Sequence, residues 1–218
     1  MKSVDIIIVK YQAPRFERAC ISSVLTETRT VPYNLIVHDN YPKNENIGVL
    51  WNKLIGKSES EYIVILNTDT LVEEGWLGKL LKVFDDHKDA GAVGPVTNNG
   101  GGNGQELEKT DDYQVFDYGK KHSLGTLCGF CLVFPKKVWE EVGGFPEDFG
   151  FYGQECAFLA KVVKKGYKQY VRTDVFVWHK GGASADLAEK RGEMNRQAEL
   201  EAGRAKRDAF FEELRKND

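Results

Sequence analysis

Two acidic residues that follow apolar runs are the first features of this sequence to indicate chemistry. Asp69 stands in N-T-D-T directly after the run YIVIL (62–66), and Asp39 closes the run NLIVHD. Apolar runs rich in β-branched residues are typical of buried strands, so both carboxylates are expected at strand ends. Carboxylate oxygens suit Mg²⁺ or Mn²⁺ as ligands. The sequence therefore predicts a polar site at one edge of a sheet.

The elements that position these acids alternate between strand and helix. Strand patterns cover 4–9, 33–40, 62–66, 90–96, 126–134 and 168–179, and helical patterns begin near Pro14, Asn46, Trp76, Pro135, Glu155 and Asp186. This alternation favours an α/β fold with a mostly parallel sheet. Ligands of such sheets bind outside the carboxyl ends of the strands, so Asp39 and Asp69 are expected to face one crevice.

Composition excludes several classes of protein. The chain has 218 residues and a net charge of −3, which fits one large α/β domain or two closely packed halves and gives no basic footprint for a nucleic-acid backbone. No run approaches the roughly 18 apolar residues of a membrane span, and the N-terminus turns polar too soon for a signal peptide. We therefore expect a cytoplasmic protein without a transmembrane segment.

The four cysteines predict no metal site. Cys128 and Cys131 have the C-x-x-C spacing, but the surrounding TLCGFCLVF is expected to be a strand, on which residues three apart point to opposite faces. Buried, reduced thiols are the expected state of all four cysteines.

Three enzyme classes with an acid at a strand end do not fit the motifs. A dinucleotide-binding domain needs a glycine fingerprint after the first strand, where this chain has VKYQAP, and a P-loop protein needs GxxxxGK[ST], which is absent. A phosphatase of the haloacid dehalogenase type needs a nucleophilic aspartate two residues before its second acid. Asn67 stands there and is a poor nucleophile.

Five segments in order resemble family 2 glycosyltransferases of the GT-A fold. They are VDIIIVKYQAPRFERACISSVL, NLIVHDN, EYIVILNTDT, CGFCLVFPKKVWEEVGGFPEDFGFYGQECAF and VFVWHKGGAS. The resemblance covers most of residues 3–185 and implies a Rossmann-like nucleotide-binding half with a mixed, mostly parallel sheet, continuous with an acceptor-binding half.

The expected organisation is one GT-A domain with a charged extension. Within the domain at 1–185, we expect a nucleotide-sugar half at 1–96, a flexible loop at 97–112 and an acceptor and catalytic half at 113–185. The extension at 186–218 mixes both charge signs, which favours a helix on the surface or packed across the domain. Contact with an oligomer partner or a membrane surface is also open.

The resemblance implies a metal site. Asp69 corresponds to the metal-binding acid of the DXD-type motif, and His179 to a histidine that completes the metal shell in several members of the family. Asn67 replaces a common aspartate of this motif, so one carboxylate is expected to hold Mn²⁺ or Mg²⁺ weakly without nucleotide. The alternative for Asp69 is a surface turn or a helix N-cap, and for His179 a polar strand end.

The resemblance also assigns nucleotide-binding residues. Asp39 is expected to accept a hydrogen bond from a base N–H, and Tyr11 to contact the base unless it is a core aromatic. The other expected nucleotide-binding residues are Asn46, Asn67, Asp69 and Lys180, with Ser184 near the phosphates. An acceptor at Asp39 favours UDP- or dTDP-type donors, although guanine also has an N–H donor.

The catalytic base is expected in YGQECAF. Family members commonly have YGED followed by a further acid, so Gln154 and Ala157 depart from the pattern and Glu155 is the remaining carboxylate. A glycosyl transfer needs one carboxylate to take the proton of the attacking hydroxyl. Asp148 is the reserve candidate, and a stabilising acid in the first helical turn is the alternative for Glu155.

These assignments predict a metal-dependent enzyme that transfers a sugar, with inversion, from a nucleotide-diphosphate sugar to an acceptor hydroxyl. Inversion follows from the resemblance. The acceptor is open: a glycan, a lipid-linked glycan, a protein, a modified base or a small molecule. The alternatives are a degenerate protein that binds nucleotide or sugar without transfer, and the phosphatase.

Overall fold

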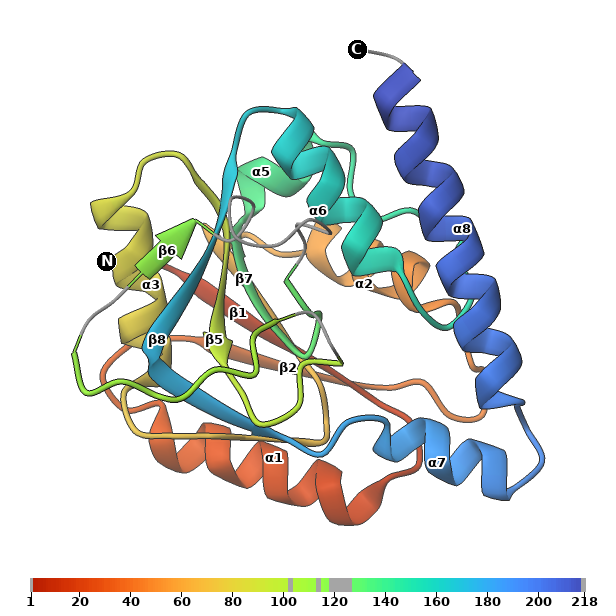
Figure 1. The fold of residues 1–218 in the computed structure, drawn as a ribbon. Helices are drawn as coiled ribbons and strands as arrows, with labels where there is room; N and C mark the ends of the chain where they lie inside the picture. Colours follow the sequence, from red (N-terminus) through yellow and green to blue (C-terminus); the bar gives the residue numbers. More distant parts are fainter. Residues whose placement is uncertain (1, 102–103, 113–114, 118–126, 217–218) are drawn as a thin grey trace.

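The protein is an α/β structure in which helices surround a central sheet (Figure 1). The computed structural model describes residues 2–101, 104–112, 115–117 and 127–216. Its elements are β1 (Val4–Lys10), α1 (Pro14–Glu27), β2 (Asn34–Asp39), α2 (Ile47–Gly56), β3 (Tyr62–Leu66), β4 (Thr70–Val72), α3 (Trp76–Asp86), β5 (Ala90–Val96), β6 (Val115–Asp117), β7 (Cys131–Pro135), α5 (Lys136–Glu141), α6 (Gln154–Lys164), β8 (Lys168–His179), α7 (Ala183–Lys190) and α8 (Arg196–Lys216). The predicted alternation of strands and helices is confirmed.

The sheet is mixed, and most of its strands share one direction. The strand order is β2-β1-β3-β7-β5-β8-β4, and β6 also pairs with β8. β1 is parallel to β2 and β3, and β5 is parallel to β8. β7 lies antiparallel between β3 and β5, so these two strands also run the same way. The carboxyl ends of β1, β2, β3, β5 and β8 therefore meet at one edge of the sheet.

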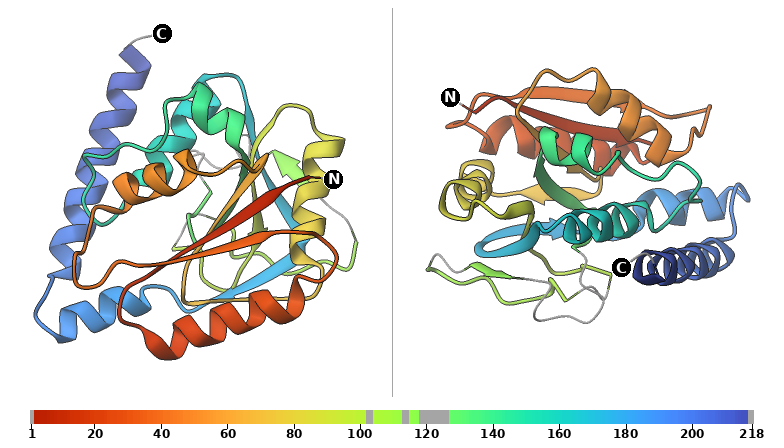
Figure 2. Two further views of the ribbon diagram at one scale, coloured as in Figure 1. Left: turned by 180° about the vertical axis from the view of Figure 1, so that it is seen from behind. Right: turned by 90° about the horizontal axis from the view of Figure 1, so that it is seen from above.

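Helices cover both faces of the sheet, as Figure 2 shows. Two apolar layers hold them there. Ile6 and Ile8 of β1 belong to the layer that packs against α1 and α3, whereas Ile7 belongs to the layer against α2, α5 and α6. Successive side chains of a strand point to opposite faces, so a strand covered on both sides must be apolar throughout. This is why the central strands could be predicted from unbroken apolar runs.

The strand β4 is absent from the sequence prediction. Thr70 pairs with His179 across antiparallel β4 and β8, and Leu71 with Trp178. The alternative of a helix cap at this position is wrong, because the helix that follows begins only at Trp76, after Gly75 with φ 72°. Three residues are too few to give a recognisable strand pattern.

The strand predicted over 126–134 is wrong in its first part. β7 begins only at Cys131, and residue 126 lies outside the described residues. The amides of Leu127 and Cys128 donate instead to the side chains of Gln169 and Gln105, at 2.9 and 2.6 Å. Glutamine side chains thus replace the strand partners here. All four cysteines are free; Cys20, Cys131 and Cys156 are buried as predicted, whereas Cys128 is half-buried.

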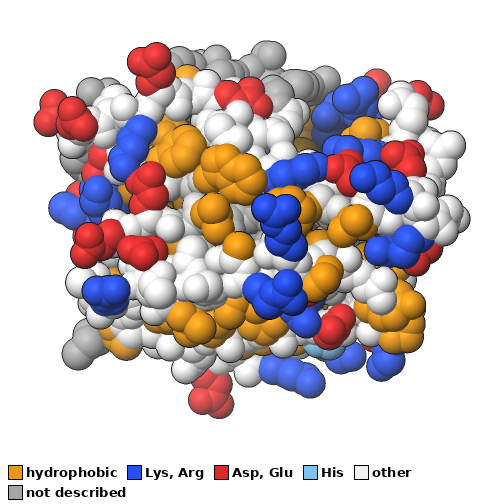
Figure 3. Space-filling view, turned by 90° about the horizontal axis from the view of Figure 1, so that it is seen from below, with side chains coloured by type: hydrophobic (Ala, Val, Ile, Leu, Met, Phe, Trp, Pro, Cys, Tyr) orange, Lys and Arg blue, Asp and Glu red, His pale blue; other side chains and the backbone are white. Residues whose placement is uncertain are grey.

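The C-terminal segment is part of the folded unit rather than an appendage. α7 begins at Ala183, before the predicted boundary, and α8 lies alongside α6 (Figure 1). The face seen from below carries acidic and basic side chains interspersed among apolar ones (Figure 3). Within the described residues, no helix is long and apolar enough to cross a membrane.

Candidate functional site

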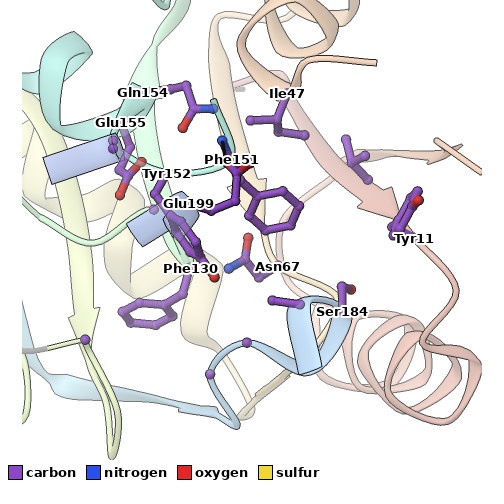
Figure 4. A pocket seen from close by; sticks show the side chains of 18 of the residues that line it. Tyr11, Ile47, Asn67, Phe130, Phe151, Tyr152, Gln154, Glu155, Ser184 and Glu199 are labelled. Atoms are coloured by element: carbon purple, nitrogen blue, oxygen red, sulfur yellow. Dashed lines mark hydrogen bonds between the residues drawn. The ribbon is translucent and has the colours of Figure 1, made fainter. Parts of the chain in front are cut away.

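A cavity of about 680 Å³ lies at the edge of the sheet where the parallel strands end. Its lining includes Tyr11, Asn67, Asp69 and His179, each at or just after the end of a strand, and Glu155 from α6. Figure 4 shows Tyr11 and Glu155 on opposite sides of this pocket, with Asn67 between them. Five of the residues expected from the sequence are thus brought together in one cavity.

The register of β4 against β8 brings Asp69 and His179 together. Because Thr70 pairs with His179, the residue before β4 lies beside the end of β8. Nε2 of His179 lies 3.4 Å from Oδ1 of Asp69, and both side chains are buried. Oδ2 of Asp69 accepts a hydrogen bond from the amide of Ala183 at 3.0 Å. The two predicted metal ligands, one before β4 and one at the end of β8, therefore face each other.

The imidazole of His179 is held in one orientation. Its Nδ1 lies 2.7 Å from the carbonyl oxygen of Asn99, which can only accept, so Nδ1 carries a proton. The ring also stacks on Phe130 with centroids 4.9 Å apart. Nε2 is buried and makes no hydrogen bond within the described part of the chain. In its neutral form, the imidazole would therefore turn the lone pair of Nε2 toward the carboxylate of Asp69.

This arrangement fits a bound cation. A lone pair facing a carboxylate is unfavourable in a buried site, and a cation between them satisfies both atoms. A metal-binding histidine usually donates its other ring N–H to a carbonyl or carboxylate, as His179 does. Burial raises the pKa of Asp69, but a hydrogen bond and positive charge at His179, with the Ala183 amide, outweigh it and lower the pKa below its usual range. A cation at Nε2 would act in the same direction.

The protein alone supplies few ligands for such a cation. Among the described residues, no group of three or more His, Cys, Asp or Glu side chains could hold a metal ion. Asp69 and His179 supply two ligands, so the remaining positions would be filled by water or by a bound substrate.

Asn98 and Asn99, at the start of the predicted loop at 97–112, hold the end of β8 in place. The side chain of Asn98 accepts from the amide of His179 at 2.8 Å and donates to its carbonyl at 2.9 Å. Asn99 donates through its side chain to the carbonyl of Lys180 at 2.9 Å. Residues 102 and 103 of the predicted loop lie outside the described residues.

Asn67 and Tyr11 present side chains to the cavity. The backbone of Asn67 is fixed, because its amide donates to Phe130 O at 2.8 Å and its carbonyl accepts from Thr70 Oγ1 at 2.7 Å. The hydroxyl of Tyr11 donates to Glu193 Oε2 at 3.3 Å, so this tyrosine is not a core residue. Both side chains are placed to meet a ligand at the end of β1 and β3.

Asp39 and Lys180 lie outside the cavity lining. The carboxylate of Asp39 is exposed, accepts from the amide of Tyr41 at 3.1 Å and pairs with Lys10 at 3.1 Å. The Tyr41 amide, followed by the ammonium group of Lys10, lowers the pKa of Asp39. Lys180 forms an ion pair with Asp186.

Asn46 lines the cavity, but its side chain also caps α2. Its Oδ1 accepts from the amides of Gly48 and Val49, at 2.8 and 3.2 Å. Its Nδ2 donates to the carbonyl of Phe149. Asn46 thus joins the start of α2 to the segment that leads to α6.

Glu155 lies in the first turn of α6 and is half-buried. Gly153, at φ 103°, precedes the helix and turns the chain into it. A Cβ on Gly129 would lie 3.0 Å from Cγ of Glu155, so this glycine leaves the space that the carboxylate occupies. Burial raises the pKa of Glu155. A carboxylate with a raised pKa that faces a cavity is suited to accept a proton.

The other positions predicted near Glu155 do not offer a second base. Asp148 lies outside the cavity lining, is exposed and pairs with Lys206 at 2.7 Å. The side chain of Gln154 donates to the carbonyl of Gly150.

The sequence prediction missed the contribution of α8. This helix lines the cavity through Arg196, Glu199, Leu200, Gly203, Arg204 and Arg207. No spacing in this charged segment indicated a site, because both charge signs recur on every face of the helix.

Solved structures of glycosyltransferases share this fold. A crystal structure of residues 1–349 of S. aureus TarS is 13% identical over 88% of this chain and 64% of that chain, with a TM-score of 0.61. A TarS structure in complex with UDP-GlcNAc has a TM-score of 0.60 and 12% identity, over 85% of this chain and 61% of that one. GalNAc-T7 with UDP, GalNAc and Mn²⁺ has a TM-score of 0.65 and 11% identity, over 87% of this chain and 48% of that one.

The fold is therefore the GT-A glycosyltransferase fold. The family model described as glycosyl transferase family 2 matches residues 35–143, which is half of the chain, and the chain belongs to this family. It spans less than two thirds of the length of the solved structures above. No curated protein shows significant similarity to the sequence.

Proposed function

We propose that this protein is a metal-dependent, inverting glycosyltransferase that takes a sugar from a nucleotide-diphosphate donor. The observation that carries the proposal is the buried Nε2 of His179, without a hydrogen bond among the described residues and 3.4 Å from the carboxylate of Asp69. Family membership and the strand-end cavity support it.

Asp69 and His179 are the residues that would hold Mn²⁺ or Mg²⁺. When bound, the ion neutralises the diphosphate that leaves the sugar. That GalNAc-T7 was solved with UDP and Mn²⁺ supports a divalent cation here. The amide nitrogen of Ala183, which fixes Asp69 Oδ2, keeps the carboxylate aimed at this position.

The nucleoside is assigned to the side of the cavity formed by β1 and β3. Tyr11 offers a ring for the base, and Asn67 offers an amide for a ribose hydroxyl. The UDP complexes of TarS and GalNAc-T7 support a UDP- or dTDP-type donor. Asp39 reaches the base only if its carboxylate leaves Lys10, since it now points outside the cavity.

Glu155 is assigned as the catalytic base. Its carboxylate takes the proton of the acceptor hydroxyl while the hydroxyl oxygen bonds to the anomeric carbon and the bond to the diphosphate oxygen breaks. The raised pKa of this buried carboxyl brings its basicity nearer to that of a proton acceptor at neutral pH. Asp148 would need to break its ion pair and enter the cavity to replace it.

A degenerate binding protein is the second candidate. Ala157 is fully buried and supplies no acid, and Gln154 is bonded to the Gly150 carbonyl, so both departures from the family pattern leave Glu155 as the carboxylate of this segment. In a protein that binds nucleotide without transfer, Asp69 would still contribute to nucleotide binding, and the substitution of Glu155 would change no activity.

Release of nucleoside diphosphate from a panel of nucleotide sugars, with and without Mn²⁺, tests the proposal. We expect one donor to be turned over by the wild type and neither Asp69→Asn nor Glu155→Gln to turn it over at a comparable rate. Glu73→Gln, an exposed acid outside the cavity, is the control and should behave as the wild type. Binding without release would favour the degenerate protein, and release of phosphate from an aryl phosphate would favour the phosphatase.

A further inference from the structure

The helix α8 is fixed against the turn at 150–153 that leads into α6. A Cβ on Gly203 would lie 2.8 Å from the carbonyl oxygen of Tyr152, so the helix backbone touches this turn. The amide of Phe151 donates to Glu199 Oε2 at 3.3 Å. The position of α8 is therefore coupled to the start of the helix that carries the candidate base.

Two arginines of α8 line the cavity beside that base. Arg204 and Arg207 are three residues apart and so lie on the same side of the helix. Both line the cavity that Glu155 also lines. The charge of Arg207 acts on Glu155, since it opposes the rise in pKa that burial causes. Two guanidinium groups thus share the cavity with the carboxylate that would meet the acceptor hydroxyl.

In the described part of the chain, Arg204 lacks the ion pairs that the neighbouring cations form, and the partner of Arg207 is exposed. Arg196 and Lys206 both form ion pairs with aspartates. Within the described residues, Arg204 forms no hydrogen bond or ion pair, and Arg207 pairs with Asp208, an exposed neighbour on its own helix. Like charges at this spacing destabilise a helix slightly, so the stability of α8 does not explain them.

We propose that Arg204 and Arg207 bind an anionic group, a phosphate or a carboxylate, of the acceptor. The inference rests on the proposed function, which assigns the donor diphosphate to Asp69 and His179 and the acceptor hydroxyl to Glu155. The planar guanidinium matches phosphate and carboxylate oxygens in a bidentate manner. The acceptors of this enzyme are therefore acidic molecules.

Binding of matched probes to the full chain tests this assignment. The nucleotide side is first filled with Mn²⁺ and the nucleoside diphosphate that stabilises the protein most. Glucose 6-phosphate, glucuronate and glucose are then titrated by calorimetry against wild type, an Arg204→Gln/Arg207→Gln double variant and Lys206→Gln. Lys206 is the matched control, because it lies between the two arginines but outside the cavity lining.

We expect at least one acidic probe to bind about tenfold or more tightly than glucose, since a hydrogen bond to a charged group contributes about a factor of ten. The preference should disappear in the double variant, persist in Lys206→Gln and weaken with salt. An equal affinity for all three probes, or a preference that survives in the double variant, would overturn the inference.

Two further outcomes separate this inference from the proposed function. If the double variant weakens nucleoside diphosphate binding about tenfold, the arginines bind the donor and the inference is wrong, while the proposed function stands. If no nucleoside diphosphate binds the wild type, the proposed function fails and the inference fails with it.

Discussion

The two sides of the cavity, which we propose bind nucleotide and acceptor, are held in different ways. On the nucleotide side, Asp69 and His179 are fixed by strand register, with Thr70 directly opposite His179. On the acceptor side, Glu155 depends on a turn of glycines and on the packing of α8. Strand register locks side chains through many backbone hydrogen bonds, whereas a packed helix can shift without breaking a sheet.

The comparison suggests that the nucleotide side is rigid and determines donor chemistry, and that the acceptor side is the more variable part. Changes at Asp69 or His179 should therefore affect nucleotide and metal binding. Changes at Glu155 or in α8 should affect transfer while nucleotide binding remains.

The largest effect is expected for Asp69→Asn. Removing the only carboxylate assigned to the metal removes several kcal/mol of charge stabilisation, so transfer should fall on the order of 10⁴-fold. Donor turnover measured over a range of Mn²⁺ concentrations checks this. A variant that keeps wild-type turnover would break the assignment of the nucleotide side, provided that Glu73→Gln also remains active.

The next effect is the loss of the base in Glu155→Gln, on the order of 10³-fold in transfer. Nucleotide binding should not change, because this side chain belongs to the acceptor side. Parallel measurements of turnover and of nucleotide affinity separate the two sides. Equal losses in both would contradict the division.

The pH dependence of transfer and of stability in wild type and Glu155→Gln gives a second test of the assigned base. The pKa of Glu155 is raised above its usual 4.5, so wild-type transfer should fall as the pH drops through a value above 4.5. The folded state binds this proton more tightly than the unfolded state, so ionisation of Glu155 costs stability as the pH rises. Glu155→Gln should therefore melt no lower than wild type at neutral pH, as calorimetry would show.

A smaller effect is expected for His179→Asn. Loss of a residue that hydrogen-bonds to a metal ligand typically weakens metal binding by about 10- to 100-fold. Loss of the imidazole ligand itself should weaken Mn²⁺ binding in the presence of nucleotide by at least about that much. Titration of the nucleotide-bound protein with Mn²⁺ measures this. Unchanged Mn²⁺ affinity would mean that His179 is only the polar end of β8.

The smallest effect is expected for Gly203→Ala. Alanine favours a helix by about 1 kcal/mol, but its Cβ would lie 2.8 Å from Tyr152 O and push α8 away. We expect a net loss of about 1 kcal/mol in the free energy of unfolding, and weaker acceptor binding at unchanged nucleotide affinity. Ala205→Ser, at an exposed position of the same helix, is the control. A stabilised variant would show that α8 is not held by this contact.

The nucleotide side could be predicted from the sequence because buried strands leave a plain signal. The runs that became β1, β3 and β5 are apolar throughout, and the polar residues after them had to meet at one edge. Asp69 and His179 followed from that pattern and from the family resemblance. The short strand β4, which sets their register, has no pattern of its own.

The acceptor side could not be predicted in the same way. The arginines of α8 lie in a helix whose charges alternate. Asp148 and Glu155 are both suitable acids in the sequence, and the ion pair of Asp148 with Lys206 distinguishes them. Asn98 and Asn99 resemble loop residues, although they hold His179 in place. Such contacts join residues about 60 to 80 positions apart, and no local pattern in the sequence records them.

The most direct test of the central claim is a thermal-shift series with nucleoside diphosphates, each with and without Mn²⁺, on wild type and Asp69→Asn. A ligand at about a hundred times its dissociation constant adds about 2.7 kcal/mol to the free energy of unfolding, which gives a clear shift. We predict that one nucleoside diphosphate stabilises the wild type, that Mn²⁺ enlarges the shift, and that Asp69→Asn loses the enlargement. Stabilisation that is independent of both Mn²⁺ and Asp69 would contradict the metal site at this strand end.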